Sequence, residues 1–184
     1  ALFNEYGPTE CTVWASATEL TREDKQVVIG KPIDNTQIYI LDRYQKLVPV
    51  GVCGEIYIGG RGVGRGYLNL PELTPEKFIA NPFSPTGTRL YRTGDLGRWL
   101  PDGNIDFLGR IDDQVKIRGF RIELGEIEQV LRQIPGIKQS CVLARERETA
   151  SGKSKFLVGY YVAEQGTEII SSFLLSELEM VLPD

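Results

Sequence analysis

Glycine and proline interrupt the chain so often before residue 112 that only short extended segments fit between them. The interruptions are densest at Gly51, Gly54, Gly59, Gly60, Gly62, Gly64 and Gly66. Residues 37–41 and 55–59 carry isoleucine and tyrosine between such turns, a pattern that predicts strands. The first part of the chain is therefore predicted to be β-rich.

Two local signals add detail to this β-rich part. Residues 101–104 (Pro-Asp-Gly-Asn) predict a tight hairpin turn, because proline and glycine stand where turn geometry favours them. The apolar residues on either side, 99–100 and 105–108, would form its strands. One short helix is predicted over residues 75–79, with Thr74 as its cap and Pro75 at its first position.

After about Asp112 the pattern changes to alternating strands and helices. Apolar residues at helical spacing predict one helix that Pro135 and Gly136 terminate. The predicted elements are strands at 115–118 and 120–122, a helix at 127–134, strands at 140–144 and 156–162, and a helix that begins after Thr167. The fold class predicted is α/β in the sense of mixed α+β, with a β-rich part over residues 1–111 and a small α+β part over residues 112–184.

Composition excludes several kinds of chemistry. The 184 residues include no histidine, which rules out Ser-His-Asp and Cys-His catalysis and every histidine-ligated metal site. The cysteines, Cys11, Cys53 and Cys141, are too far apart for a Cys-x-x-Cys clamp and suit a reducing compartment, so we expect a cytoplasmic protein. A net charge of −4 and the lack of a long apolar run favour neither a nucleic-acid nor a membrane partner.

Two glycine-containing segments imitate phosphate-binding loops. Residues 60–66 (Gly-Arg-Gly-Val-Gly-Arg-Gly) fit no G-x-G-x-x-G register. Residues 152–154 (Gly-Lys-Ser) copy the end of such a loop, but Arg147 stands where the pattern requires glycine. Both segments are predicted to be turns.

Three polar segments carry the candidate chemistry. Residues 4–10 (Asn-Glu-Tyr-Gly-Pro-Thr-Glu) combine a ring, a hydroxyl and a carboxylate, which suit a purine, a phosphate and Mg²⁺. Residues 91–96 (Tyr-Arg-Thr-Gly-Asp-Leu) place an aspartate beside a glycine, where it could accept from two ribose hydroxyls. Residues 109–128 alternate charged and apolar side chains. Taken singly, residues 4–10 are also compatible with an ordinary polar loop, residues 91–96 with an Asx turn, and residues 109–128 with a solvated edge hairpin.

Together with residues 54–68, these segments resemble the adenylation domains of nonribosomal peptide synthetases, within the superfamily of acyl-CoA synthetases and luciferases. Residues 4–10 match the family motif NxYGPTE, and residues 54–68 match GELxIxGxG(V/L)xRGYL. Residues 91–96 match YRTGDL, and residues 109–128 match GRxDxQVKIRGxRIELGEIE. The sequence Gln-Val-Lys-Ile-Arg at residues 114–118 favours amino-acid-activating members of the superfamily over acyl-CoA ligases.

The resemblance implies an amino-acid adenylating ligase that uses ATP and Mg²⁺ and transfers the aminoacyl group to a phosphopantetheine. Its partners would be the amino-acid substrate and the peptidyl carrier and condensation domains of the same synthetase. Nucleotide-binding residues would be Asn4, Tyr6, Thr9, Asp95 and Arg110. Thr9, Glu10 and Lys116 would be catalytic, and Glu10 would also hold the metal.

The resemblance also implies roles outside the nucleotide site. Glu5, Val13 and Trp14 would line the amino-acid pocket, and the size of an indole favours a small substrate side chain. Alternatively, Trp14 packs into the core behind the pocket. Asp112 would be the hinge between the two half-reactions. The pantetheine path would be bordered by Lys116, Arg118, Gly119 and Phe120.

The sequence lacks several parts of that family pattern. The upstream phosphate loop, the aspartate that anchors the substrate amino group and the late lysine are absent, and residues 182–183 match only the start of the motif LPxYMxP. We therefore expect a C-terminal fragment of an adenylation domain, cut at both ends and inactive by itself. The alternatives are a free-standing acyl- or aryl-CoA ligase and an inactive nucleotide-binding fragment.

Overall fold

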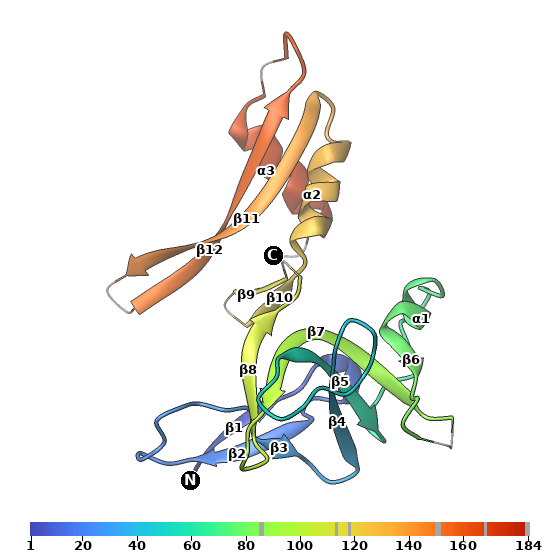
Figure 1. Cartoon of the computed structure of the whole chain (residues 1–184). Helices are drawn as coiled ribbons and strands as arrows, with labels where there is room; N and C mark the ends of the chain where they lie inside the picture. The colour runs from blue at the N-terminus through green and yellow to red at the C-terminus, as the bar shows by residue number, and fades with distance from the viewer. Residues whose placement is uncertain (85–86, 113, 118, 150–151, 168, 183–184) are drawn as a thin grey trace. The chain divides into compact units, whose positions relative to one another are not determined.

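The computed structural model describes residues 1–84, 87–112, 114–117, 119–149, 152–167 and 169–182 (Figure 1). The chain forms two compact units, Ala1–Ile111 and Asp112–Asp184, each with its own hydrophobic core. We call them unit 1 and unit 2. The predicted mixed α+β fold is confirmed, since strands predominate in both units and helices are few among the described residues.

Unit 1 begins with a small antiparallel sheet in the order β1-β2-β3. Its strands are β1 (Leu2–Tyr6), β2 (Ser16–Leu20) and β3 (Lys31–Pro32), and a short 3₁₀ helix, η1 (Thr9–Cys11), follows β1. The sequence pattern did not predict β1. Its apolar residues Leu2 and Phe3 are adjacent and both exposed, so they do not show the alternation of buried and exposed positions that marks a strand.

The larger sheet of unit 1 has the order β4-β5-β7-β6, with β8 paired to β7. Its elements are β4 (Thr36–Leu41), β5 (Gly54–Gly60), α1 (Leu73–Lys77), β6 (Phe78–Ala80), β7 (Arg89–Trp99) and β8 (Ile105–Arg110). The predicted strands at 37–41 and 55–59 and the hairpin around 101–104 are confirmed. The register places Ile38 opposite Ile58 and Ile40 opposite Ile56, so isoleucines from neighbouring strands pack together.

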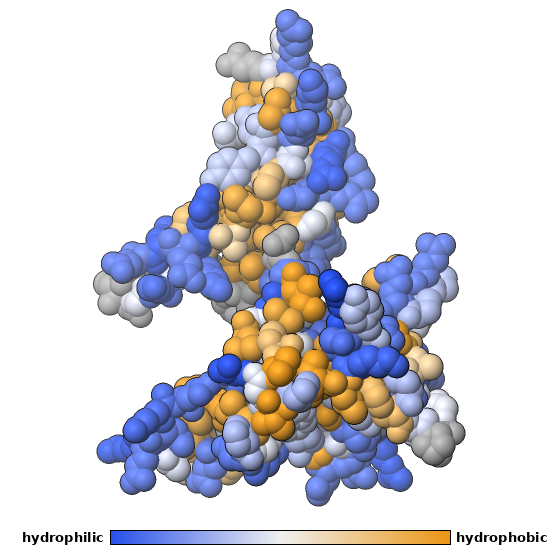
Figure 2. All heavy atoms as spheres, in the orientation of Figure 1, coloured by the Kyte–Doolittle hydropathy of each residue, from blue (hydrophilic) through white to orange (hydrophobic). Residues whose placement is uncertain are grey.

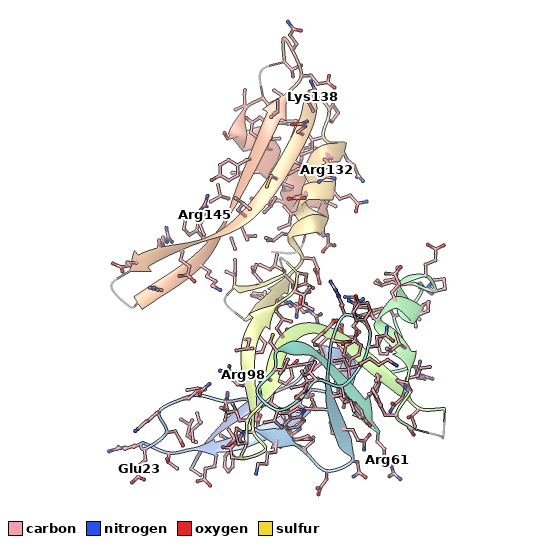
Figure 3. All side chains as sticks on the ribbon, in the orientation of Figure 1. Glu23, Arg61, Arg98, Arg132, Lys138 and Arg145 are labelled. Carbon is pink, nitrogen blue, oxygen red and sulfur yellow. The ribbon has the colours of Figure 1, made fainter. Side chains whose placement is uncertain are left out.

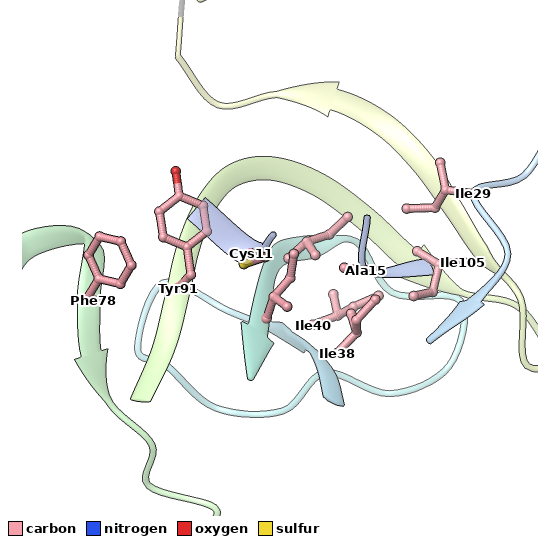
Figure 4. Packing of buried hydrophobic residues seen from close by; sticks show 10 residues of the cluster. Cys11, Ala15, Ile29, Ile38, Ile40, Phe78, Tyr91 and Ile105 are labelled. Atoms are coloured by element: carbon pink, nitrogen blue, oxygen red, sulfur yellow. The ribbon is translucent and has the colours of Figure 1, made fainter. Parts of the chain in front are cut away.

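The core of unit 1 lies where the two sheets meet (Figure 4). Ile40, Ile56 and Tyr91 have no exposed surface, and the ring of Tyr91 lies 5.2 Å from that of Phe78, centroid to centroid. Cys11 and Ala15, from the segment that joins β1 to β2, complete this core. The segment between β1 and β2 is therefore packed against the larger sheet.

The cap predicted at Thr74 is wrong. Helix α1 begins at Leu73, and Thr74 lies inside it. The Thr74 hydroxyl donates to the Leu70 carbonyl at 2.8 Å and accepts from the Tyr67 amide at 3.0 Å. Thr74 thus ties the helix to the segment before it instead of capping the helix.

Unit 2 pairs a long hairpin with two helices. The elements are β9 (Val115–Ile117), β10 (Phe120–Ile122), α2 (Leu124–Gln133), β11 (Ile137–Thr149), β12 (Gly152–Ala163) and α3 (Ser171–Val181). Leu124, Leu131, Val142 and Leu174 form its core. Hydrophilic side chains gather at the turn end of the β11–β12 hairpin (Figure 2).

The helix predicted after the strands at 115–118 and 120–122 is confirmed as α2, but two predictions for unit 2 are wrong. Helix α3 begins at Ser171 rather than directly after Thr167, and Ile169, which packs against the core, precedes the helix. Residues 152–154 are the first residues of β12 and not a turn. No helix among the described residues is long and apolar enough to cross a membrane.

Candidate functional site

The first motif, residues 4–10, folds as the end of a strand and the turn that follows it. Strand β1 places Asn4 and Tyr6 on one face and Glu5 on the other, since side chains alternate along a strand. Asn4 and Tyr6 are half-buried, whereas Glu5 is exposed. The side-chain amide of Asn4 donates to the Val28 carbonyl at 2.6 Å. Thr9 opens the 3₁₀ helix and is exposed.

Gly7 lets the chain after η1 return close to this motif. A Cβ atom at Gly7 would lie 2.3 Å from the Trp14 Cα and 2.6 Å from the Val13 carbonyl oxygen. Val13 has a φ of +75°, and the Trp14 amide donates across it to the Thr12 carbonyl at 3.0 Å. A β-branched residue in this region is strained, and such strain is typical of functional sites.

Two of the residues predicted to line the amino-acid pocket, Val13 and Trp14, lie in this turn, and the third, Glu5, lies on β1. Val13 is 76% exposed and Trp14 41% exposed, so Trp14 is not buried in the core of this structure. Glu5 lies on the β1 face opposite Tyr6. The structure brings the backbone of Val13 and Trp14 next to Gly7. Among the described residues, no hydrogen bond joins either of them to the Glu5 side chain.

Asp95 is the centre of a buried polar cluster. Its Oδ2 accepts from the Tyr6 hydroxyl at 2.5 Å, and its Oδ1 accepts from the Arg110 guanidinium at 2.6 Å. Asp95 is 7% exposed. Burial and the neighbouring Asp95 charge raise the pKa of the Tyr6 hydroxyl, which therefore stays protonated and donates. The carboxylate does not form the Asx turn considered from sequence, because it bonds residues distant in the chain.

This carboxylate has acceptor capacity left. An ionised carboxylate can accept about four hydrogen bonds. Among the described residues, Tyr6 and Arg110 are the hydrogen-bonding partners recorded for the Asp95 side chain. About two acceptor positions of the carboxylate therefore remain for further donors.

Glu10 is held by the glycine-rich segment at residues 60–67. The Tyr67 hydroxyl donates to Glu10 Oε1 at 2.7 Å, and the Gly64 amide donates to the Glu10 carbonyl at 2.8 Å. Burial raises the pKa of Tyr67, as do its hydrogen bonds with Tyr91 and Glu10. The sequence pattern predicted only a turn for this segment, and it did not single out Tyr67, although Tyr67 lies within the motif ending RGYL.

Glu10 is the residue of the first motif whose side chain could hold a metal ion. The described residues contain no group of three or more histidine, cysteine, aspartate or glutamate side chains placed to hold a metal. Mg²⁺ usually takes one or two carboxylates together with substrate phosphates and waters. One oriented carboxylate therefore suffices for such a site.

The residues singled out in unit 2 lie at its beginning. Asp112 is exposed, and its Oδ1 accepts from the Gln114 amide at 3.3 Å. Gly119, with a φ of +88°, joins β9 to β10. Phe120 is 64% exposed and lines an apolar groove of about 840 Å³ together with Ile122, Leu157 and Leu174. The Lys116 side chain and all of Arg118 lie outside the described residues.

Sequence comparisons identify the same family that the motifs suggest. The family of AMP-binding enzymes matches residues 1–68. A segment of bacitracin synthase 3 from Bacillus licheniformis is 55% identical over 96% of this chain and 3% of that protein. Gramicidin S synthase 2 from Brevibacillus brevis is 50% identical over 99% of this chain and 4% of its own length. The chain thus spans a small part of these relatives.

Solved structures of nonribosomal peptide synthetases are also similar to this chain. PA1221, a nonribosomal peptide synthetase protein containing adenylation and PCP domains, has a TM-score of 0.78 and 33% identity over 96% of this chain and 35% of its own. Holo-AB3403, a four-domain nonribosomal peptide synthetase bound to AMP and glycine, has a TM-score of 0.57 and 49% identity over 89% of this chain and 12% of its own. Nearly the whole chain is thus similar to segments of nonribosomal peptide synthetases, among them proteins that contain adenylation domains, and residues 1–68 match the AMP-binding enzymes.

Proposed function

We propose that this chain supplies the nucleotide-binding end of a domain that activates an amino acid with ATP. In the reaction, a carboxylate oxygen of the amino acid attacks the α-phosphorus of ATP, and pyrophosphate leaves with the electrons of the broken P–O bond. The aminoacyl-AMP product then passes its acyl group to the phosphopantetheine thiol of a carrier domain, with release of AMP. The observation that carries the proposal is the cluster of Tyr6, Asp95 and Arg110, in which three motif residues from distant parts of the chain meet.

In this proposal Asp95 binds the ribose hydroxyls. Arg110 and Tyr6 each occupy one oxygen of the Asp95 carboxylate and so fix the orientation of the carboxylate. Hydrogen bonds to a charged acceptor are stronger than neutral ones, which favours tight and oriented ribose binding. The ring of Tyr6 would stack on adenine, with Asn4 near the amino edge of the base.

Thr9 and Glu10 would act at the phosphates. The exposed Thr9 hydroxyl would bond the α-phosphate, and Glu10, oriented by Tyr67, would hold Mg²⁺. Bound there, the ion would neutralise phosphate charge. Phosphoryl transfer depends mainly on positioning and on charge stabilisation, so a chain without histidine is suited to it. Lys116 would contribute a positive charge in the same reaction.

Unit 2 would serve the second half-reaction. We assign Ala1–Ile111 to the large core subdomain and Asp112–Asp184 to the small C-terminal subdomain, with Asp112 as the hinge between them. Lys116, Arg118, Gly119 and Phe120 would border the path of the pantetheine arm. The partners would be an amino acid and the carrier and condensation domains of the same synthetase. The three free cysteines support a location in the reducing cytoplasm.

Amino-acid-dependent ATP–pyrophosphate exchange tests this proposal. The complete adenylation domain that contains this chain should exchange pyrophosphate with at least one amino acid of a panel and should then acylate a carrier protein that bears phosphopantetheine. A Glu10→Gln variant should lose most of the exchange. Thioester formation on free coenzyme A with aryl or fatty acids, together with no exchange for any amino acid, would contradict the proposal.

A further inference from the structure

Strand β7 does not pair evenly with β5. Glu55 lies opposite Leu96 and Tyr57 lies opposite Arg92, so a two-residue step on β5 faces a four-residue step on β7. The residues left over, 93–95, form a bulge, and Gly94 at its centre has a φ of +76°. Bulges re-aim side chains and are frequent beside functional sites. The residue re-aimed by this bulge is Asp95.

Two buried side chains satisfy the backbone of the bulge. The Glu55 carboxylate accepts from the Gly94 amide at 3.1 Å and from Arg92 Nε at 3.0 Å. The Thr93 hydroxyl donates to the Ile56 carbonyl at 2.7 Å and accepts from the Asp95 amide at 2.9 Å. These amides would otherwise be buried donors without a ladder partner, which is costly.

Glu55 itself is held in place on several sides. It is 8% exposed, and the Tyr57 hydroxyl donates to its second oxygen at 3.1 Å. Its ion pair with Arg92 balances its charge, and Arg92 stays partly exposed. A buried carboxylate with this many donors is rigid, so the bulge that it closes is rigid too.

We propose that Glu55 is a positioning residue for nucleotide binding: by closing the bulge at residues 93–95, it holds the Asp95 carboxylate in the orientation that accepts the ribose hydroxyls. Thr93 acts with it from the other side of the bulge. This inference rests on the proposed ribose contact of Asp95.

The test compares nucleotides that do or do not carry the ribose hydroxyls. In the complete adenylation domain, kcat/KM for pyrophosphate exchange is measured with ATP, 2′-deoxy-ATP and 3′-deoxy-ATP. The wild type should prefer ATP to at least one deoxy analogue by about tenfold or more, the size expected for a hydrogen bond to a charged group. Asp95→Ala should reduce that preference to about one.

Two isosteric variants decide the inference. Glu55→Gln and Thr93→Val should each reduce the preference for ATP to below about threefold, and Thr93→Ser, which keeps the hydroxyl, should retain it. Either of the first two variants is sufficient if the other does not fold. The signature is lost discrimination, because a purely structural defect lowers the rates with all three nucleotides by the same factor.

Asp106→Asn is the matched control. Asp106 is a buried carboxylate on β8 that accepts from Arg98 Nε at 3.0 Å and from Gln26 Nε2 at 2.7 Å, away from the bulge (Arg98 is labelled in Figure 3). This variant should lower stability and leave the preference for ATP unchanged.

The outcomes separate the two proposals. If Asp95→Ala keeps the preference for ATP, the ribose contact is wrong and the role of Glu55 is overturned with it. If Asp95→Ala loses the preference while Glu55→Gln and Thr93→Val retain it, the ribose contact stands and the role of Glu55 is overturned.

Discussion

Replacing Gly7 by alanine should destabilise unit 1 and leave unit 2 unaffected. The added Cβ would lie 2.3 Å from the Trp14 Cα, 2.6 Å from the Val13 oxygen and 2.8 Å from the Ala15 nitrogen. Ordinary contacts begin near 3.4 Å, so the backbone of residues 13–15 would have to move by about 1 Å. This movement would also disturb the hydrogen bond from the Ala15 amide to the Tyr6 carbonyl, which measures 2.7 Å.

The expected loss is about 3 kcal/mol, the upper end of the range for overpacking, because backbone and not flexible side-chain atoms are in the way. Tryptophan fluorescence during urea unfolding measures it, since both tryptophans, Trp14 and Trp99, lie in unit 1. The urea midpoint should fall by roughly 1–2 M.

Gly125→Ala makes the same chemical change with the opposite expected result. Gly125 lies in α2, and apart from its chain neighbours and the backbone of its own helix no atom lies within 4 Å of the position of a Cβ. Alanine there should stabilise unit 2 by about 0.5 kcal/mol, as measured by helical circular dichroism, because most helical residues lie in that unit. A Gly7→Ala change smaller than about 0.5 kcal/mol would refute the close approach between residues 7 and 13–15.

Three further predictions concern pH, the hinge and the pocket. Burial raises the pKa of Tyr57 and that of Cys11 each to about 12. The folded state therefore holds these protons more tightly than the unfolded chain does. The free energy of unfolding should be highest below a pH of about 9 and should fall as the pH rises towards 12, by at most about 1.4 kcal/mol per pH unit for each group. Urea midpoints at several pH values would measure this loss, and Tyr57→Phe should reduce the slope. Asp112→Pro fixes φ near −65° and, in the complete domain, should preserve pyrophosphate exchange while thioester loading of the carrier falls; an equal loss of both would indicate a folding defect. Trp14→Ala should extend exchange activity to bulkier amino acids, with about 1–3 kcal/mol of discrimination per methylene, and a wild type that already prefers aromatic or arginine substrates would contradict a small pocket.

Local sequence patterns correctly predicted the strands and helices whose apolar residues follow the spacing of that element. Strands β4 and β5 were predicted because isoleucine and tyrosine alternate between turns, and α2 because its apolar residues recur at helical spacing. Strand β1 was missed because its apolar residues are exposed, and its pairing with β2 depends on the core beneath residues 11–15. Thr74 failed as a cap because it bonds Leu70 and Tyr67, a contact that spacing does not reveal.

The candidate site depends on contacts between distant residues, which spacing cannot predict. Tyr6 and Asp95 are 89 positions apart, and Glu10 and Tyr67 are 57 positions apart. Only the family resemblance placed Tyr6 and Asp95 in one site. The supporting residues Tyr67, Glu55 and Thr93 emerged from the structure, because their role lies in the hydrogen bonds that they make to motif residues.

The most direct test of the nucleotide assignment is a crystal structure of the complete adenylation domain with AMP bound. We expect at least one of the two ribose hydroxyls to lie within about 3.2 Å of an Asp95 carboxylate oxygen, with Arg110 still hydrogen-bonded to that carboxylate. A bound AMP whose ribose contacts other side chains, while Asp95 bonds only Tyr6 and Arg110, would contradict the assignment.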